Sequence, residues 1–106
     1  MNEKGYNGYE NYETWAVSLW LNNEYGEYCH WTARAEEIKE DAEDEYEEGD
    51  TFTAEEVARG RLADEIKEAV EGGNPLADSA SLYSDLMGKA LGNVDWYEVA
   101  ESFLEE

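Results

Sequence analysis

The chain has 106 residues, which is enough for one domain with a modest core and too few for a second. It carries 28 acidic residues against seven basic ones, and this formal net charge of −21 excludes binding to nucleic acid or to an anionic membrane through a basic face. Four Trp and eight Tyr make it too rich in aromatics for a disordered acidic tail, so we expect a folded domain whose partners are basic proteins or cations.

Residues 1–10 are rich in glycine and tyrosine and show no periodicity, so we expect a flexible arm before a single helical domain of residues 11–106. Tyr6, Tyr9 and Tyr12 either pack back over a helix or form an exposed aromatic surface. Asn11 is a favourable N-cap for a first helix from about Tyr12 to Asn23. Three-and-four spacing predicts the buried face of this helix: Tyr12, Trp15, Ala16, Leu19 and Trp20, widened by Val17 and Leu21.

A second helix is predicted from about Glu27 to Glu47. Its apolar line comprises Tyr28, Trp31, Ala35, Ile38, Ala42 and Tyr46. Beyond Ile38 this line thins to alanine and one tyrosine while acids accumulate. We therefore expect the first half of the helix to lie in the core and the second half to project along the surface.

Three further helices follow. Thr53 and Glu56 form a capping box that opens a helix to about Val70, and Asp95 and Glu98 resemble a second box. The expected buried faces are Val57, Ala58, Leu62, Ile66, Ala69 and Val70 in the third helix; Leu82, Tyr83, Leu86, Met87 and Ala90 in a fourth, Ser79–Leu91; and Trp96, Val99, Ala100, Phe103 and Leu104 in the last. The pattern predicts an all-α fold of four to five helices in an irregular small bundle.

All four tryptophans, Trp15, Trp20, Trp31 and Trp96, lie on apolar stripes, which predicts core positions for them. The alternative is that one of them, or the arm with Tyr6, contacts a partner or a second copy of the chain.

The strings Tyr6-Asn7-Gly8, Asn11-Tyr12-Glu13-Thr14-Trp15-Ala16-Val17 and Leu19-Trp20-Leu21-Asn22-Asn23 resemble a family of short acidic proteins of phages, plasmids and related mobile elements. The family has no settled activity, so the resemblance implies a mobile-element setting without a mechanism. In size and charge, the chain also resembles anti-restriction and anti-CRISPR DNA mimics, which block host defence proteins by occupying their DNA-binding clefts.

The segment Glu36–Asp50 holds ten carboxylates and one base, Lys39. On a helix they fall within about 22 Å, a density close to the one charge per ~1.7 Å of duplex DNA. Like charges at helical spacing are destabilising, and a solvated face would usually intersperse lysines. The carboxylates predicted to contact a partner are Glu36, Glu37, Glu40, Asp41, Asp44, Glu47, Glu48, Asp50, Glu55 and Glu56, with Asp64, Glu65, Glu68 and Glu71 as further contributors.

This pattern favours a non-catalytic interaction protein that imitates nucleic acid and occupies the DNA- or RNA-binding site of a basic host protein. Three alternatives stand beside it. The first is binding to a basic protein without mimicry, the second is a helical adaptor that acts through its aromatic arm, and the third is a surface that serves only solvation.

Other chemistry finds little support. Asp44–Glu55 partly matches a calcium-binding loop, but Tyr46 and Glu48 stand where Asp or Asn is expected. Cys29 and His30 are adjacent on a helix and cannot face each other as nucleophile and base. We predict no enzyme, no cofactor and no built metal site, and weak binding of divalent cations to the acids stays an alternative.

The single cysteine excludes an intramolecular disulfide and is typical of a reducing compartment. The polar first residues do not resemble a signal peptide, and no apolar run is long enough to span a membrane. These features predict a protein of the host cytoplasm.

Overall fold

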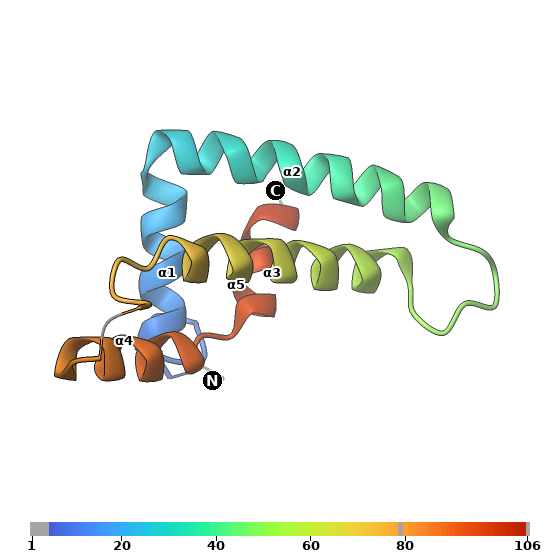
Figure 1. The fold of residues 1–106 in the computed structure, drawn as a ribbon. Coiled ribbons are helices and arrows are strands. Elements are labelled where there is room, and N and C mark those ends of the chain that lie inside the picture. The colour runs from blue at the N-terminus through green and yellow to red at the C-terminus, as the bar shows by residue number, and fades with distance from the viewer. Residues whose placement is uncertain (1–4, 79, 106) are drawn as a thin grey trace.

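A computed structural model describes residues 5–78 and 80–105. These residues form five helices: α1 (Tyr12–Asn23), α2 (Tyr25–Glu45), α3 (Ala54–Gly72), α4 (Leu82–Gly92) and α5 (Trp96–Leu104). The only extended pairing in the described ranges is an isolated bridge between Tyr6 and Tyr9. The predicted all-α fold is confirmed (Figure 1).

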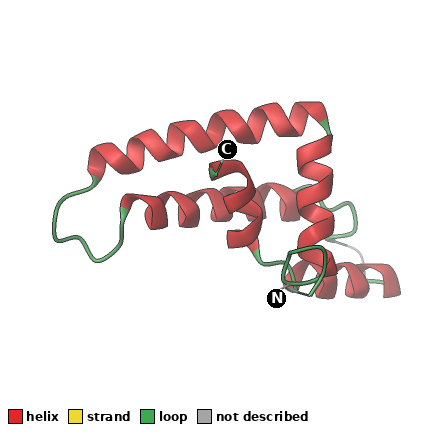
Figure 2. Cartoon of the chain, turned by 180° about the vertical axis from the view of Figure 1, so that it is seen from behind, coloured by secondary structure: helices red, strands yellow, loops and turns green. Residues whose placement is uncertain are grey.

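α2 and α3 lie side by side and run in opposite directions, and α5 packs against both (Figure 1). α1 stands across one end of this layer, where it contacts α2 and α5. The loop between α2 and α3 lies at the opposite end. Figure 2 shows the same arrangement from behind, with the N-terminal turn and α4 at the foot of α1.

The core lies where α2, α3 and α5 meet. Leu62, Ile66 and Val99 are fully buried, and burial of each such side chain stabilises the fold by about 1.5–3 kcal/mol. The other buried apolar residues are Leu21, Trp31, Ala35, Ile38, Ala42, Ala58, Ala63, Val94, Ala100 and Phe103. The predicted inward lines of α2, α3 and α5 are therefore largely confirmed.

The expectation that the second half of α2 would project along the surface instead of lying in the core is wrong. Ala42 is only 3% exposed, because α3 packs along α2 beyond Ile38. Alanine at this position lets the two helices approach closely. The acidic half of α2 is thus one side of a two-helix pair.

The predicted buried face of α1 is confirmed only at Leu21, with Val17 partly buried against the core, because the helix is rotated about its axis relative to the prediction. Thr14, Ser18 and Leu21 face inward, whereas Trp20 is 71% exposed and Tyr12 is 55% exposed. The inward hydroxyl of Thr14 donates to Asn11 Oδ1 at 2.7 Å and accepts from the backbone N–H of Asp95 at 2.8 Å. This joint to the start of α5 fixes the rotation of α1 about its axis.

The apolar stripe of α4, expected to face inward, is exposed as well. Leu82, Tyr83 and Leu86 are each more than half exposed, and no residue of α4 is buried. The helix begins after the capping box of Ser81 with Ser84, and its predicted first residue, Ser79, lies outside the described residues. α4 is therefore defined by its caps and not by packing.

The other helix ends follow their caps. Asn11 caps α1, and the capping box of Thr53 with Glu56 is confirmed at α3. α2 begins at Tyr25, about two residues earlier than predicted, because the Glu24 side chain accepts from the backbone N–H of Glu27. It ends at Glu45, which is also about two residues earlier than predicted.

Residues 6–9 form a tight turn at the foot of α1. Asn7 and Gly8 both have positive φ, at 48° and 89°, as a type I′ turn requires. Backbone hydrogen bonds of 2.9 and 2.7 Å pair Tyr6 with Tyr9. The ring of Tyr6 packs on Tyr12 and Trp15, with centroids 5.3 and 4.9 Å away.

Candidate functional site

The ten predicted carboxylates occupy three different places. All ten are exposed. Five lie on α2, three in the loop that follows it, and two in the first turn of α3: Glu36, Glu37, Glu40, Asp41 and Asp44; Glu47, Glu48 and Asp50; Glu55 and Glu56.

The five on α2 lie opposite its buried line. Helical periodicity puts Trp31, Ala35, Ile38 and Ala42 on one face, and all four are buried. The acids therefore point away from α3 and α5. We call Glu36, Glu40, Asp41 and Asp44 the α2 acidic row, whereas Glu43 lines a hollow between α2, α3 and α5.

No ion pair involves this row within residues 5–78 and 80–105. Its four carboxylates fall within about 12 Å of helix length, or one per ~3 Å, compared with one charge per ~1.7 Å of duplex DNA. The charge densities differ by less than a factor of two.

The basic residues explain why the row has no ion pair. On one edge of the α2–α3 pair, Arg34 of α2 binds Glu65 of α3 at 2.5 Å. Arg61 of α3 binds Glu45 of α2 at 2.6 Å. Arg59 of α3 binds Glu101 of α5 at 2.6 Å. These cations connect neighbouring helices instead of interspersing the acids on the outer face of α2.

Glu37 differs from the row because Arg34 also binds it, at 2.5 Å. The two hydrogen bonds from Arg34 lower the pKa of Glu65, while partial burial opposes this shift. The same contacts raise the pKa of Arg34. This edge of the pair is therefore partly neutralised, whereas the outer face of α2 is not.

The loop acids are arranged by the turn itself. The Asp50 carboxylate accepts from the backbone N–H of Glu47 at 2.9 Å, and Asp50 N–H donates to the Glu47 carbonyl at 3.0 Å. Gly49 takes φ 97° between them. The predicted stripe thus leaves the helix after Glu45, and its last three members follow a bend.

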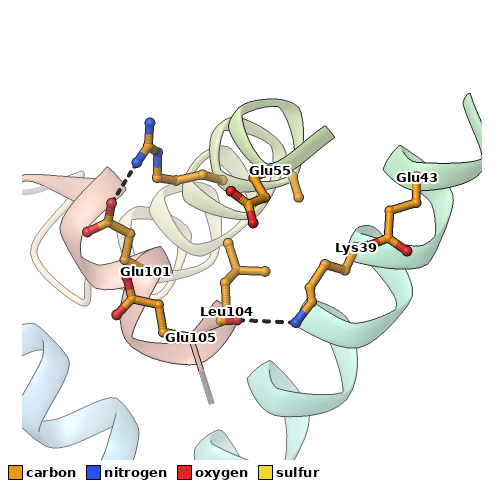
Figure 3. A pocket seen from close by; sticks show the side chains of 8 residues that line it. Lys39, Glu43, Glu55, Glu101, Leu104 and Glu105 are labelled. Atoms are coloured by element: carbon orange, nitrogen blue, oxygen red, sulfur yellow. Dashed lines mark hydrogen bonds and ion pairs between the residues drawn. The ribbon is translucent and has the colours of Figure 1, made fainter. Parts of the chain in front are cut away.

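Glu55 and Glu56 are separated by the start of α3. The Glu56 carboxylate accepts from the Thr53 N–H at 2.9 Å, as part of the capping box. Glu55 faces a hollow of about 210 Å³ between α2, α3 and α5 (Figure 3). Neither residue extends the line on α2.

That hollow mixes both signs of charge. Lys39 Nζ donates to the Leu104 carbonyl at 3.2 Å, where it stabilises the C-terminal end of α5 (Figure 3). Glu43, Glu55, Glu101 and Arg59 also line the hollow. A nucleophile with an oriented base, the minimum for covalent catalysis, is not among the residues that line it.

Cys29 and His30 are both exposed on α2. The His30 ring stacks edge-on against Trp31, with centroids 4.5 Å apart. Cys29 hydrogen-bonds Tyr25 and raises the pKa of that phenol. Within the described part of the chain, no three His, Cys, Asp or Glu side chains converge as metal ligands, and no helix is long and apolar enough to cross a membrane.

Sequence reasoning missed the outward aromatic surface of α1. Tyr12, Leu19 and Trp20 are exposed, and Trp15 is half-buried beneath Tyr6. The signal in the sequence was the pair Thr14 and Ser18, which lie on the same helix face as Leu21. Hydroxyls are ordinarily assigned to the solvent side, so this signal was weaker than the tryptophans.

Comparison with known proteins gives a family and no activity. No curated protein matches this chain, and no solved structure does. Residues 2–100 match a family described as "Family of unknown function (DUF7249)". Because the match spans nearly the whole chain, the protein belongs to this family.

Proposed function

We propose that this protein is a non-catalytic acidic interaction protein that binds a basic nucleic-acid-binding protein in place of DNA or RNA. The α2 acidic row would occupy the lysines and arginines that otherwise hold phosphates. Binding of this kind is fast, weakened by salt and competitive with nucleic acid.

The observation that carries this proposal is the separation of cations from the row. Arg34, Arg59 and Arg61 are bound between helices, and the four carboxylates of the α2 acidic row form no ion pair within residues 5–78 and 80–105. Like charges three and four residues apart destabilise a helix by a few tenths of a kcal/mol per pair. A basic partner would relieve that repulsion.

The α2–α3 pair supports the proposal further. Asp64, Glu68 and Glu71 are exposed on α3, beside α2. Two adjacent helices with free carboxylates resemble the two phosphate strands of a duplex more closely than a single helix does. We propose the host cytoplasm as the setting and a defence protein as the target, from the resemblance to mobile-element proteins.

A test needs variants that change charge without changing fold. Replacing Glu36 and Glu40 by Gln, and Asp41 and Asp44 by Asn, removes four charges from α2. The matched control removes four exposed charges that form no ion pair with any residue in 5–78 and 80–105: Glu10→Gln, Asp78→Asn, Asp85→Asn and Glu105→Gln.

A lysate of the source cell is loaded on a resin that carries duplex DNA, and each form of the protein is then added to the resin. Mass spectrometry identifies the proteins that are displaced from the DNA. The wild type and the control should displace the same DNA-binding protein, and the α2 variant should not. Equal displacement by both variants, or none by the wild type, would reject the proposal.

The second candidate function is a helical adaptor that binds through aromatic residues. The exposure of Trp20, at 71%, favours it, because exposed aromatics concentrate binding energy. Tyr6 of the arm instead packs on α1, so the surface available to a partner is α1 itself. An adaptor of this kind would tolerate the α2 charge variant and lose its partner with Trp20→Ala.

A further inference from the structure

The outer face of α1 is aromatic and carries one charged residue, Glu13. We call Tyr6, Tyr12, Trp15, Leu19 and Trp20 the α1 aromatic face. The rings of Tyr6, Tyr12 and Trp15 contact one another, with centroids 4.9–5.6 Å apart. Leu19 is 38% exposed beside Trp20 at 71%.

A hollow of about 250 Å³ borders this face. Tyr9, Trp15 and Leu19 form its walls, and Asn22, Asn23 and Ser102 supply its polar groups. No charged side chain lines it, whereas each of the other four hollows described has at least two. It is therefore suited to a neutral side chain and offers no contact to a basic one.

Charge is segregated along the molecule. The described chain is 49 Å long in its greatest dimension, with α1 at one end and the α2–α3 loop at the other (Figure 1). α1 contains a single charged residue, Glu13. Glu24 and Glu27 are exposed at the junction of α1 with α2. The α2 acidic row begins eleven residues after Tyr25, about 16 Å along the helix, or two Debye lengths at physiological salt, where one is about 8 Å.

We propose that the α1 aromatic face binds the same face of a second copy, which gives a two-fold symmetric dimer. In such an interface each contact occurs twice, because the same surface of both copies is used and the two-fold axis relates the two contacts. Trp20 of each copy would enter the uncharged hollow of its partner. The two α2 acidic rows then lie at opposite ends of the dimer.

The occupant follows from charge and area. A basic partner attracted by the net charge of −21 would bind the acids of α2 and α3. Two copies of the chain repel each other less when they meet through α1 than when they meet through these acidic helices. Tyr12 and Trp20 together leave on the order of 300 Å² accessible, since an aromatic side chain buries about 150–250 Å². Tyr6 and Leu19, each 38% exposed, add on the order of 150 Å². The α1 aromatic face thus supplies roughly half of the ~800 Å² per partner of a stable interface, and the rim of the hollow would supply the rest.

Sedimentation equilibrium of the full chain between about 1 and 100 µM tests the proposal, a range that brackets the micromolar affinities expected of such interfaces. The wild type should dimerise, and Leu19→Glu should weaken the dimer about 30-fold or more, as loss of a hot spot does. The matched control is Leu86→Glu on α4, which makes the same change on another exposed leucine and should leave the dimer intact.

Trp20→Ala gives a second reading if Leu19→Glu fails to fold, because so exposed a side chain contributes little to the monomer. Far-UV circular dichroism verifies that each variant is folded. A wild type that is monomeric throughout, or a dimer disrupted by Leu86→Glu and not by the α1 variants, would overturn the proposal.

Salt separates this proposal from the proposed function. Screening reduces repulsion between two acidic copies, so added salt should strengthen the dimer. The same salt should weaken binding of a basic partner to the α2 acidic row. A dimer that weakens with salt would contradict the assignment to the α1 aromatic face, whatever the lysate experiment finds.

Discussion

Arg34 of α2 binds Glu65 of α3 through two parallel hydrogen bonds, from Nε to Oε1 at 2.9 Å and from Nη2 to Oε2 at 2.5 Å. This bidentate geometry fixes the relative position of two helices whose outer faces are acidic. The pair therefore helps to hold like-charged helices together.

The Arg34–Glu65 pair makes stability depend on pH. Arg34 lowers the pKa of Glu65 in the folded state, so the folded chain binds that proton less tightly than the unfolded chain does. The stabilisation is fully present above the ordinary glutamate pKa of about 4.3. It is lost as the pH falls through the lowered folded value.

Glu65→Gln should therefore destabilise the fold at neutral pH, by about 0.5–1 kcal/mol, because both side chains are a third or more exposed and solvent screens the pair. Urea denaturation of the variant and the wild type should give curves that converge in acid. Glu37→Gln, at a more exposed partner of Arg34, is the control and should have a smaller effect. A difference that persists unchanged in acid would contradict this.

Thr14 and Ser18 make a matched pair of buried hydroxyls. Thr14 Oγ1 bridges Asn11 and the Asp95 N–H, whereas Ser18 Oγ has no hydrogen-bond partner in the described ranges. Thr14→Val should destabilise the fold by about 1–3 kcal/mol, since it leaves a partly buried N–H unsatisfied. Ser18→Ala should be neutral or stabilising in the same denaturation experiment. Equal effects would mean that the joint between α1 and α5 is not held by Thr14.

Leucines on α3 and α4 should respond differently to truncation. Leu62 is fully buried, and Leu62→Ala should destabilise the fold by about 2–5 kcal/mol. Leu86 is 59% exposed, and Leu86→Ala should change the free energy of unfolding by less than about 0.5 kcal/mol. Thermal melts of dilute protein measure both. A large effect of Leu86→Ala would show that α4 packs in solution.

Self-repulsion should make the fold sensitive to ionic strength. The wild-type Tm should rise as NaCl increases from about 0.01 to 0.15 M, because the screening length falls from about 30 to 8 Å. The variant with four neutralised residues on α2 should show a smaller rise than the control with four neutralised elsewhere, since the α2 charges lie closest together. An equal rise in both would mean that total charge, and not its position, governs stability.

The sequence by itself determined the helices. Side-chain caps are local, so Asn11, Thr53 and Asp95 could be identified as helix starts from their neighbours in the chain. The inward lines of α2, α3 and α5 were also predictable. Each of these helices is polar on one side, which leaves a single apolar face to bury.

Only the tertiary structure decided the orientation of α1 and α4. α1 is apolar around most of its circumference, so periodicity does not select one face. The choice was made by the Thr14 hydroxyl, which donates to Asn11 and accepts from the backbone N–H of Asp95, 81 residues away. α4 has a clear apolar stripe, but no other helix packs on it extensively, and a sequence pattern records which face is apolar without recording whether anything covers it.

The pairing of charges was likewise a tertiary result. The composition gave seven bases without their partners, and Arg34, Arg59 and Arg61 reach acids 16 to 42 residues away. Since ion pairs form between side chains that the fold brings together, the sequence could define the acidic stretch but not which of its members stay without a cation. Those without an ion pair among the described residues, on the outer face of α2, are the ones that the proposed basic partner would contact.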